Sequence, residues 1–237
     1  DMLGVQALVD QMTAAGFAPA DWVLTMLKAG RDSFYQYEDG SIVGVYDVSK
    51  QDYVRIARTP GLVLLKEQKL IKKNAGASLY DMGDGVAGVE FHTKMNALDA
   101  DIVEIINEAL DRSENEFDGL VIGNEADHFS AGANLFMVVV AAQQGMWDQL
   151  DEMIVGLQNV MMRMRYSPKP VVVAPSGMAL GGGCEMVMHG SRVVAAGELY
   201  TGLVELGAGV IPAGGGTKEM MRRIINPAMK VPEAVGL

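Results

Sequence analysis

The sequence predicts an α/β fold in which helices pack on a parallel or mixed sheet, preceded by a short helical segment and a linker. Short apolar runs bounded by glycine or proline alternate with longer segments whose apolar residues recur at helical spacing. Elements that alternate in this way form a sheet covered by helices. With 237 residues, 49% of them hydrophobic, the chain can bury a sizeable core.

Residues 1–30 are expected to form two short helices. Gly16 is a candidate C-cap for the first helix, Pro19 lies at the start of the second, and Gly30 marks its end. Two short helices are too few to form a domain. The mixed, polar stretch 31–76 is interpreted as a linker, which places a domain boundary just before Ala77.

The rest of the chain carries the alternating pattern. An Asp-Gly turn predicts a hairpin. Asp99 or Asp101 can cap a helix that ends near Arg112, and its predicted buried face consists of Ile102, Ile105, Ile106, Ala109 and Leu110. The expected strands are 77–82, 86–92, 119–123, 171–174 and 192–196, and the expected helices are 99–112, 148–165 and 183–189.

Composition excludes several classes of function. The net charge of −11 argues against a nucleic-acid partner. No stretch approaches the roughly 20 apolar residues of a membrane span, and no signal peptide is evident. Cys184 is the only cysteine, which fits a reducing, cytoplasmic compartment. His92, His128 and His189 lack metal-ligand spacing, so no metal site is predicted.

Two glycine-containing segments carry the chemistry: Phe129-Ser-Ala-Gly-Ala133 and Ala179-Leu-Gly-Gly-Gly-Cys-Glu185. Small residues where a strand gives way to a helix let backbone N–H groups approach a ligand. If the N–H groups of Ala133 and Gly182 face one another, they form an oxyanion hole for an enolate derived from a thioester. The second segment is expected to begin a helix, whose dipole adds favourable potential.

Two carboxylates are candidates for proton transfer. Glu185 is expected on the first turn of that helix, and the chain between can return Glu205 to the same place. A pair of close acids titrates together, so one can be protonated while the other acts as a base. The alternative interpretation is that the three glycines form a tight packing turn and that both glutamates lie on the surface.

These segments, together with Lys94-Met-Asn-Ala-Leu98 and 207–217, resemble the enoyl-CoA hydratase/isomerase (crotonase) superfamily from about Ala77 to the C-terminus. The resemblance implies a crotonase-like spiral of ββα units. It also implies oxyanion donors at Ala133 and Gly182 and catalytic acids at Glu185 and Glu205. Substrate-binding roles are implied for the following residues: Lys94, Ala131, Gly132, Asn134, Leu135 and Gly181.

A closer likeness rests on Gly16-Phe17, Ser33-Phe-Tyr35, Gly132-Ala-Asn-Leu135 and Ile211-Pro-Ala-Gly-Gly-Gly-Thr-Lys-Glu-Met220. With these segments the whole chain looks like the C-terminal part of bacterial multifunctional 3-hydroxyacyl-CoA dehydrogenases. On this likeness, 1–30 is the helical tail of an upstream dehydrogenase domain, 31–76 is a linker, and 77–237 is a hydratase-like domain that is C-terminally truncated. No Gly-x-Gly-x-x-Gly motif follows a strand near the N-terminus, so this piece is expected to bind no NAD and to need no cofactor. NAD would belong to the upstream domain.

The resemblance implies hydration of trans-2-enoyl-CoA to 3-hydroxyacyl-CoA in fatty-acid β-oxidation. The partner is then an acyl-CoA substrate, and the family suggests a homotrimer or hexamer. Retention of both Glu185 and Glu205 favours the hydratase. The alternatives are Δ3-Δ2 enoyl-CoA isomerisation and a non-catalytic acyl-CoA-binding module.

Overall fold

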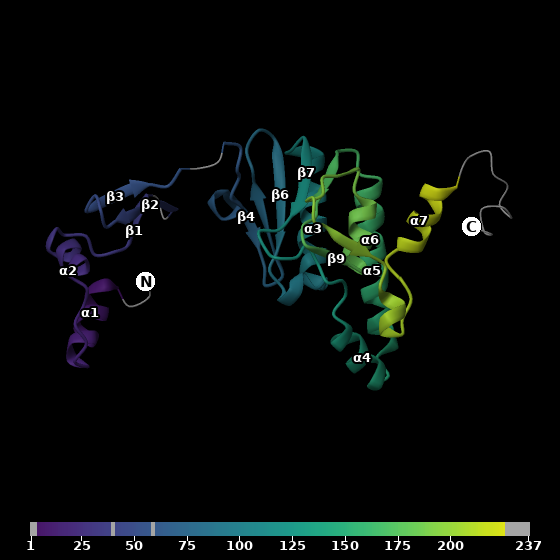
Figure 1. The fold of residues 1–237 in the computed structure, drawn as a ribbon. Coiled ribbons are helices and arrows are strands. Elements are labelled where there is room, and N and C mark those ends of the chain that lie inside the picture. The colour runs from purple at the N-terminus through teal and green to yellow at the C-terminus, as the bar shows by residue number, and fades with distance from the viewer. Residues whose placement is uncertain (1–3, 39–40, 58–59, 226–237) are drawn as a thin grey trace. The chain divides into compact units, whose positions relative to one another are not determined.

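The computed structural model describes residues 4–38, 41–57 and 60–225, and the chain divides into two compact units, 1–63 and 64–237. Residues 226–237, which the sequence assigned to the end of the hydratase-like domain, lie outside the described residues. Figure 1 shows the order of the elements along the chain. No helix in the described ranges is both long and apolar enough to cross a membrane.

The first unit contains the two helices that the sequence predicted, α1 (Val5–Ala14) and α2 (Asp21–Lys28). Gly16 and Gly30 follow them with positive φ, the conformation that ends a helix. An antiparallel sheet comes next, formed by β1 (Tyr35–Glu38), β2 (Ser41–Asp47) and β3 (Asp52–Arg55).

These strands replace the linker that the sequence predicted between residues 31 and 76. Tyr46 of β2 packs in one cluster with Val5, Val9, Val23 and Met26 of the two helices. The apolar face of the helices therefore packs against aromatic side chains of the stretch 31–76, since Phe34 and Tyr53 also lie against this cluster. The division between the units falls at residues 63 and 64, ahead of the predicted boundary at Ala77.

The second unit is built on a six-stranded mixed sheet with the order β10-β8-β7-β6-β5-β4. Its strands are β4 (Lys69–Lys73), β5 (Ala77–Asp81), β6 (Val86–Phe91), β7 (Gly119–Gly123), β8 (Val171–Ala174) and β10 (Arg192–Val193). The β5–β6 hairpin and β4 are antiparallel, whereas β6, β7, β8 and β10 run parallel. The strand expected at 192–196 covers only its first two residues.

Helices bury one apolar stripe each against this sheet. In α3 (Ala100–Asn115), Asp99 is the N-cap and accepts a hydrogen bond from Ile102 N. Ile105, Ile106 and Ala109 of this helix are fully buried in the core cluster. The α5 helix (Trp147–Arg165) contributes Val160, Met161 and Met164 to the same cluster. The predicted buried face of α3 is therefore confirmed.

A second, smaller row of strands explains the spiral. Following β8, β9 (Met178–Leu180) pairs in parallel with β11 (Tyr200–Gly202), and Ser130 forms a bridge to Ala179. Each of these turns of chain places one strand in the large sheet, one short segment in the small row, and then a helix. The helix α3 follows Leu98, which bridges to Ala133; α4 (Leu135–Gln143) and α5 follow Ser130; and α6 (Gly182–His189) follows β9. This is the ββα spiral that the resemblance implied.

Candidate active site

The two glycine-containing segments meet where the small row of strands ends. A methyl group placed on Gly182 would lie 3.6 Å from the nitrogen of Ala133, and one placed on Gly132 would lie 3.2 Å from the nitrogen of Gly182. Leu98 N donates to Gly132 O at 2.8 Å, which holds the first loop in place. The two predicted donor nitrogens therefore lie close together, as an oxyanion hole requires.

Three features of the local sequence create this approach. Gly132 and Gly181 have φ values of 92° and 53°, which residues with a side chain rarely adopt. A methyl group on Gly183 would lie 2.8 Å from both Cβ and the carbonyl oxygen of Ser130. Glycine is therefore needed at these positions both for conformation and for the close contact of two backbones.

Both predicted acids face the same cavity, whose volume is about 590 Å³. Its lining includes Glu185, Glu205 and the following residues that the sequence predicted: Ala131, Gly132, Ala133, Leu135, Gly181 and Gly182. The interpretation that both glutamates are surface residues does not fit this placement, since Glu185 is buried on the first turn of α6.

The carboxylate of Glu185 is held by two backbone amides. Gly214 N donates to Oε2 at 3.0 Å and Gly216 N donates to Oε1 at 2.8 Å. Burial raises the pKa of Glu185, although these two hydrogen bonds favour the ionised form and oppose the shift. A carboxyl group with a raised pKa that is still oriented by hydrogen bonds can act as a general base near neutral pH.

Glu205 comes from the short 3₁₀ helix η3 (Glu205–Ala208) and lies against the Gly181 loop. A methyl group on Gly181 would lie 3.3 Å from Glu205 Oε1. Its other oxygen, Oε2, is buried and has no hydrogen-bond partner among the described residues. A buried carboxyl oxygen without a partner inside a cavity is available to a substrate or a water molecule.

A buried polar cluster supports α6 on the side of α7 (Gly216–Ile224). His189 Nδ1 lies 2.7 Å from the backbone oxygen of Glu185, and its Nε2 lies 3.3 Å from Lys218 Nζ. The neutral tautomer with its proton on Nδ1 satisfies both contacts. Glu219 is buried between Lys218 and Arg222, each at 3.1 Å. Burial acts to raise the pKa of Glu219, but the hydrogen bonds from Lys218 and Arg222 outweigh it and the pKa is lowered.

Two residues that the sequence predicted to bind substrate do not line the cavity. Lys94 is exposed in the 3₁₀ turn Lys94–Asn96, and Asn134 is the N-cap of α4 (Leu135–Gln143), where its side chain accepts from Met137 N at 3.4 Å. Cys184 is buried and its thiol pKa is raised by burial, which is consistent with a structural residue. In the described part of the chain, no group of three His, Cys, Asp or Glu side chains could hold a metal.

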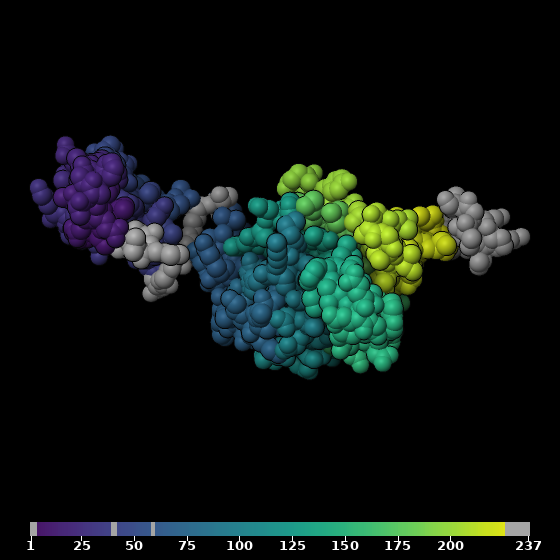
Figure 2. Space-filling view, turned by 90° about the horizontal axis from the view of Figure 1, so that it is seen from below, coloured from purple at the N-terminus to yellow at the C-terminus, as the bar shows by residue number. Residues whose placement is uncertain are grey.

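Sequence reasoning missed the amides of Gly214 and Gly216 and the apolar wall formed by α4 and α5. The signal for the amides was the Gly214-Gly-Gly-Thr217 run, since consecutive glycines expose backbone N–H groups. The face of the molecule in Figure 2 presents α4 and α5, coloured green, beside the yellow-green segment that follows β11. Gln158 of α5 donates to Ala213 O at 2.7 Å and joins these segments.

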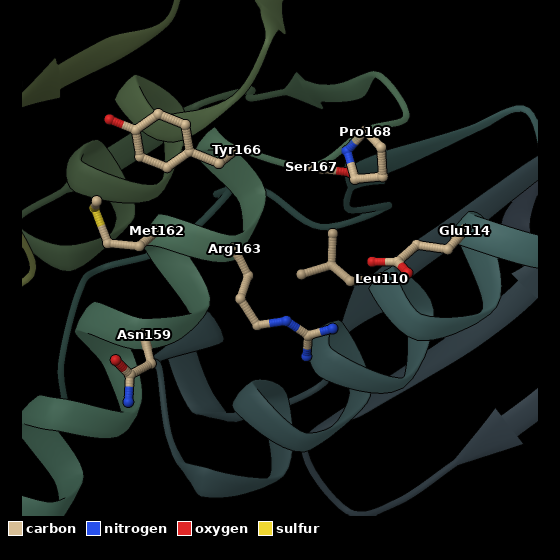
Figure 3. Close-up of a pocket in the computed structure, with 8 residues that line it drawn as sticks. All are labelled: Leu110, Glu114, Asn159, Met162, Arg163, Tyr166, Ser167 and Pro168. Atoms are coloured by element: carbon tan, nitrogen blue, oxygen red, sulfur yellow. The ribbon is translucent and has the colours of Figure 1, made fainter.

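A second hollow lies between α3 and the end of α5, away from the two acids (Figure 3). The side chain of Arg163 extends across it toward α3. Its guanidinium group donates hydrogen bonds to Asn107 and Asp111 of that helix. Leu110 and Tyr166 also line this hollow. The arginine is satisfied by the protein itself, so this hollow is read as a packing feature of two helices.

Comparison with known proteins agrees with this arrangement. Residues 81–232 match the model of the enoyl-CoA hydratase/isomerase family. A crystal structure of an enoyl-CoA hydratase from Polaromonas sp. JS666 superposes with a TM-score of 0.57 at 26% identity, covering 71% of this chain and 62% of that one. The fold and the site therefore define a crotonase-type protein, and the chain belongs to the enoyl-CoA hydratase/isomerase family.

Two relatives indicate the context of the chain. It is 41% identical to a Bacillus subtilis (strain 168) protein named "Probable 3-hydroxyacyl-CoA dehydrogenase", over all of this chain and 31% of the relative. It is 34% identical to a Rickettsia felis protein named "Putative fatty acid oxidation complex trifunctional enzyme", over 68% of this chain and 22% of the relative. The chain thus spans less than a third of the length of either relative.

Proposed function

We propose that the second unit catalyses the reversible syn hydration of a trans-2-enoyl-CoA to a 3-hydroxyacyl-CoA. The observation that carries this proposal is the presence of Glu185, Glu205 and the Ala133–Gly182 amide pair in one cavity. A reaction that develops negative charge on a thioester oxygen needs the amides, and the addition of water across a double bond needs two proton-transfer groups.

The roles follow from the contacts. The thioester oxygen accepts hydrogen bonds from Ala133 N–H and Gly182 N–H. Glu185 takes a proton from water while the water oxygen bonds to C3, and the C2–C3 π electrons move toward the thioester as an enolate. Glu205 then donates a proton to C2, and proton exchange with water restores both acids. Removal of one oxyanion donor typically costs about 10²–10³ in rate, so the amide pair accounts for a large share of the catalysis.

For the whole protein we propose a role in fatty-acid oxidation, with an NAD-dependent 3-hydroxyacyl-CoA dehydrogenase domain upstream that oxidises the hydration product. The names of the two relatives support this proposal. The first unit, in which α1 and α2 pack on β2, would be the end of that domain, and NAD would be bound by the part of the domain upstream of it. We also propose that the protein is a homotrimer or hexamer and that it works in the cytoplasm. Light scattering on the purified full-length protein would test the oligomeric state.

The test is the Glu185→Gln variant of the full-length protein, assayed with crotonyl-CoA. Loss of a general base is expected to lower kcat by about 10²–10⁴, with butyryl-CoA binding retained because glutamine keeps the size of the side chain. Normal hydration by the variant would overturn the assignment. Two further assays address the alternatives: conversion of a 3-enoyl-CoA without hydration would indicate the isomerase, and binding without turnover would indicate a non-catalytic module.

A further inference from the structure

Gly156 lies in the middle of α5, a helix of 19 residues, where nothing in the helix itself calls for glycine. Glycine lowers helix stability relative to alanine because it loses more backbone freedom on folding. Its φ is not positive, and a methyl group placed there would meet no atom within 4 Å. Neither backbone conformation nor close packing within the described chain therefore explains this residue.

The open space beside Gly156 belongs to the cavity of the candidate active site, because Gly156 lines that cavity. Gln149, Met153 and Gly156 share one face of α5, since residues three and four apart on a helix are neighbours. All three line the cavity, and Val160, the next residue on that face, is fully buried in the core. The cavity therefore follows this stripe toward the core.

Most residues that line this part of the cavity are apolar, and the polar ones besides the two acids are Asp99, Gln149 and Glu152. Leu135 and Val138 of α4 lie on the lining, as do Val210 and Ile211 from the segment after η3. The amide donors and the two acids line the same cavity. A cavity of about 590 Å³ lies within the range of roughly 300–1,000 Å³ that is usual for small-molecule sites.

We propose that the acyl chain of the thioester runs between α4 and α5 past Gly156, and that Gly156 makes room for a long, straight-chain 2-enoyl-CoA. This inference rests on the proposed hydratase function. An unbranched hydrocarbon tail fits an apolar channel because each buried methylene adds a favourable contribution. A side chain at position 156 would occupy the channel and shorten the longest chain that the site accepts.

The test compares Gly156→Leu and Gly156→Ala with the matched control Val155→Leu in the full-length protein. Val155 is exposed on the same helix and does not line the cavity. We measure kcat/KM for crotonyl-CoA, 2-octenoyl-CoA and 2-dodecenoyl-CoA. For Gly156→Leu we expect the value for 2-dodecenoyl-CoA to fall about tenfold to a hundredfold relative to crotonyl-CoA, a range typical of an overfilled apolar site.

For Gly156→Ala, we expect kcat/KM for 2-dodecenoyl-CoA to fall about twofold to fivefold relative to crotonyl-CoA. Alanine favours a helix, so this variant provides the test if the leucine variant does not fold. The control is expected to leave the chain-length profile unchanged. An equal effect of Gly156→Leu on short and long substrates would overturn the proposal.

Failure of the proposed hydratase function can be distinguished from failure of the inference about Gly156. If the wild type hydrates none of the substrates, calorimetry with butyryl-CoA and dodecanoyl-CoA decides the inference alone. Tighter binding of dodecanoyl-CoA that Gly156→Leu selectively abolishes would support it, and unselective binding would overturn it.

Discussion

The carboxylate of Glu185 accepts a hydrogen bond from the backbone N–H of Gly216, 31 residues further along the chain, at 2.8 Å. Glu185 lies on the first turn of α6 and Gly216 is the first residue of α7, so the bond joins two helices that are distant in sequence. The orientation of the candidate base therefore depends on the glycine run 214–216.

The Gly216→Ala substitution tests this dependence. The added methyl group would lie 2.8 Å from Glu185 Cγ and 2.7 Å from Leu203 Cδ2, so the carboxylate has to shift. A misplacement of about 1 Å can cost about 10²-fold, and we expect kcat for hydration to fall by that order while butyryl-CoA still binds. Gly197→Ala is the control, because a methyl group there meets nothing within 4 Å. Equal kcat values for the two variants would contradict the role of Gly216.

Gly132→Ala is expected to disrupt the amide pair. Gly132 has φ 92°, and its added methyl group would lie 2.8 Å from Leu180 O and 3.2 Å from Gly182 N. Separation of the two donors should lower kcat/KM by about 10²–10³, the usual effect of losing an oxyanion donor. Gly145→Ala carries a comparable conformational cost at φ 68° but meets no atom within 4 Å. If Gly145→Ala lowers the rate as much as Gly132→Ala does, the effect is one of folding and not of the donors.

Asn96 is expected to stabilise the turn that precedes Leu98. It is buried at φ 50°, and its Nδ2 donates to His128 O at 2.9 Å. Loss of that hydrogen bond in Asn96→Gly should lower the free energy of unfolding by about 1–3 kcal/mol. Asn96→Ala should cost about 1–2 kcal/mol more, because alanine resists the left-handed conformation. Urea denaturation measures both variants, and equal losses would show that the backbone conformation contributes nothing.

His189 gives the protein a pH-dependent component of stability. Burial lowers the pKa of His189, and the nearby Lys218 acts in the same direction, against the hydrogen bond to Glu185 O and the charge of Glu219. Below the unfolded pKa of about 6.5, the unfolded chain binds a proton that the folded chain does not. The stability that neutral, buried His189 contributes is therefore present above the unfolded pKa, and it is lost as pH falls toward the lower pKa of the folded state.

Urea denaturation between neutral pH and pH 5 should accordingly show a shallower decline of the free energy of unfolding for His189→Gln than for the wild type. Parallel slopes for the wild type and His189→Gln would contradict this assignment.

Local signals in the sequence were strong where one face of an element is buried. The stripe Ile102, Ile105, Ile106 predicted α3, and Gly119–Gly123 and Val171–Ala174 were predicted with the bounds that the structure has. The strands of the first unit were missed because they are short and because polar and charged residues, such as Asp47, Asp52 and Arg55, are mixed with the apolar ones. The helix α4 was missed because Leu135–Gln143 is apolar on all sides and has no helical periodicity.

By itself, the sequence determined the alternation of strands and helices and the two glycine segments with their acids, since these depend on residue type and short spacing. Tertiary structure alone decided that Gly214 and Gly216 hold Glu185, that Glu205 reaches the Gly181 loop, and that Gly156 lines the same cavity. These relationships join residues that are far apart in the chain, and only the stacking of successive turns of the spiral brings them together.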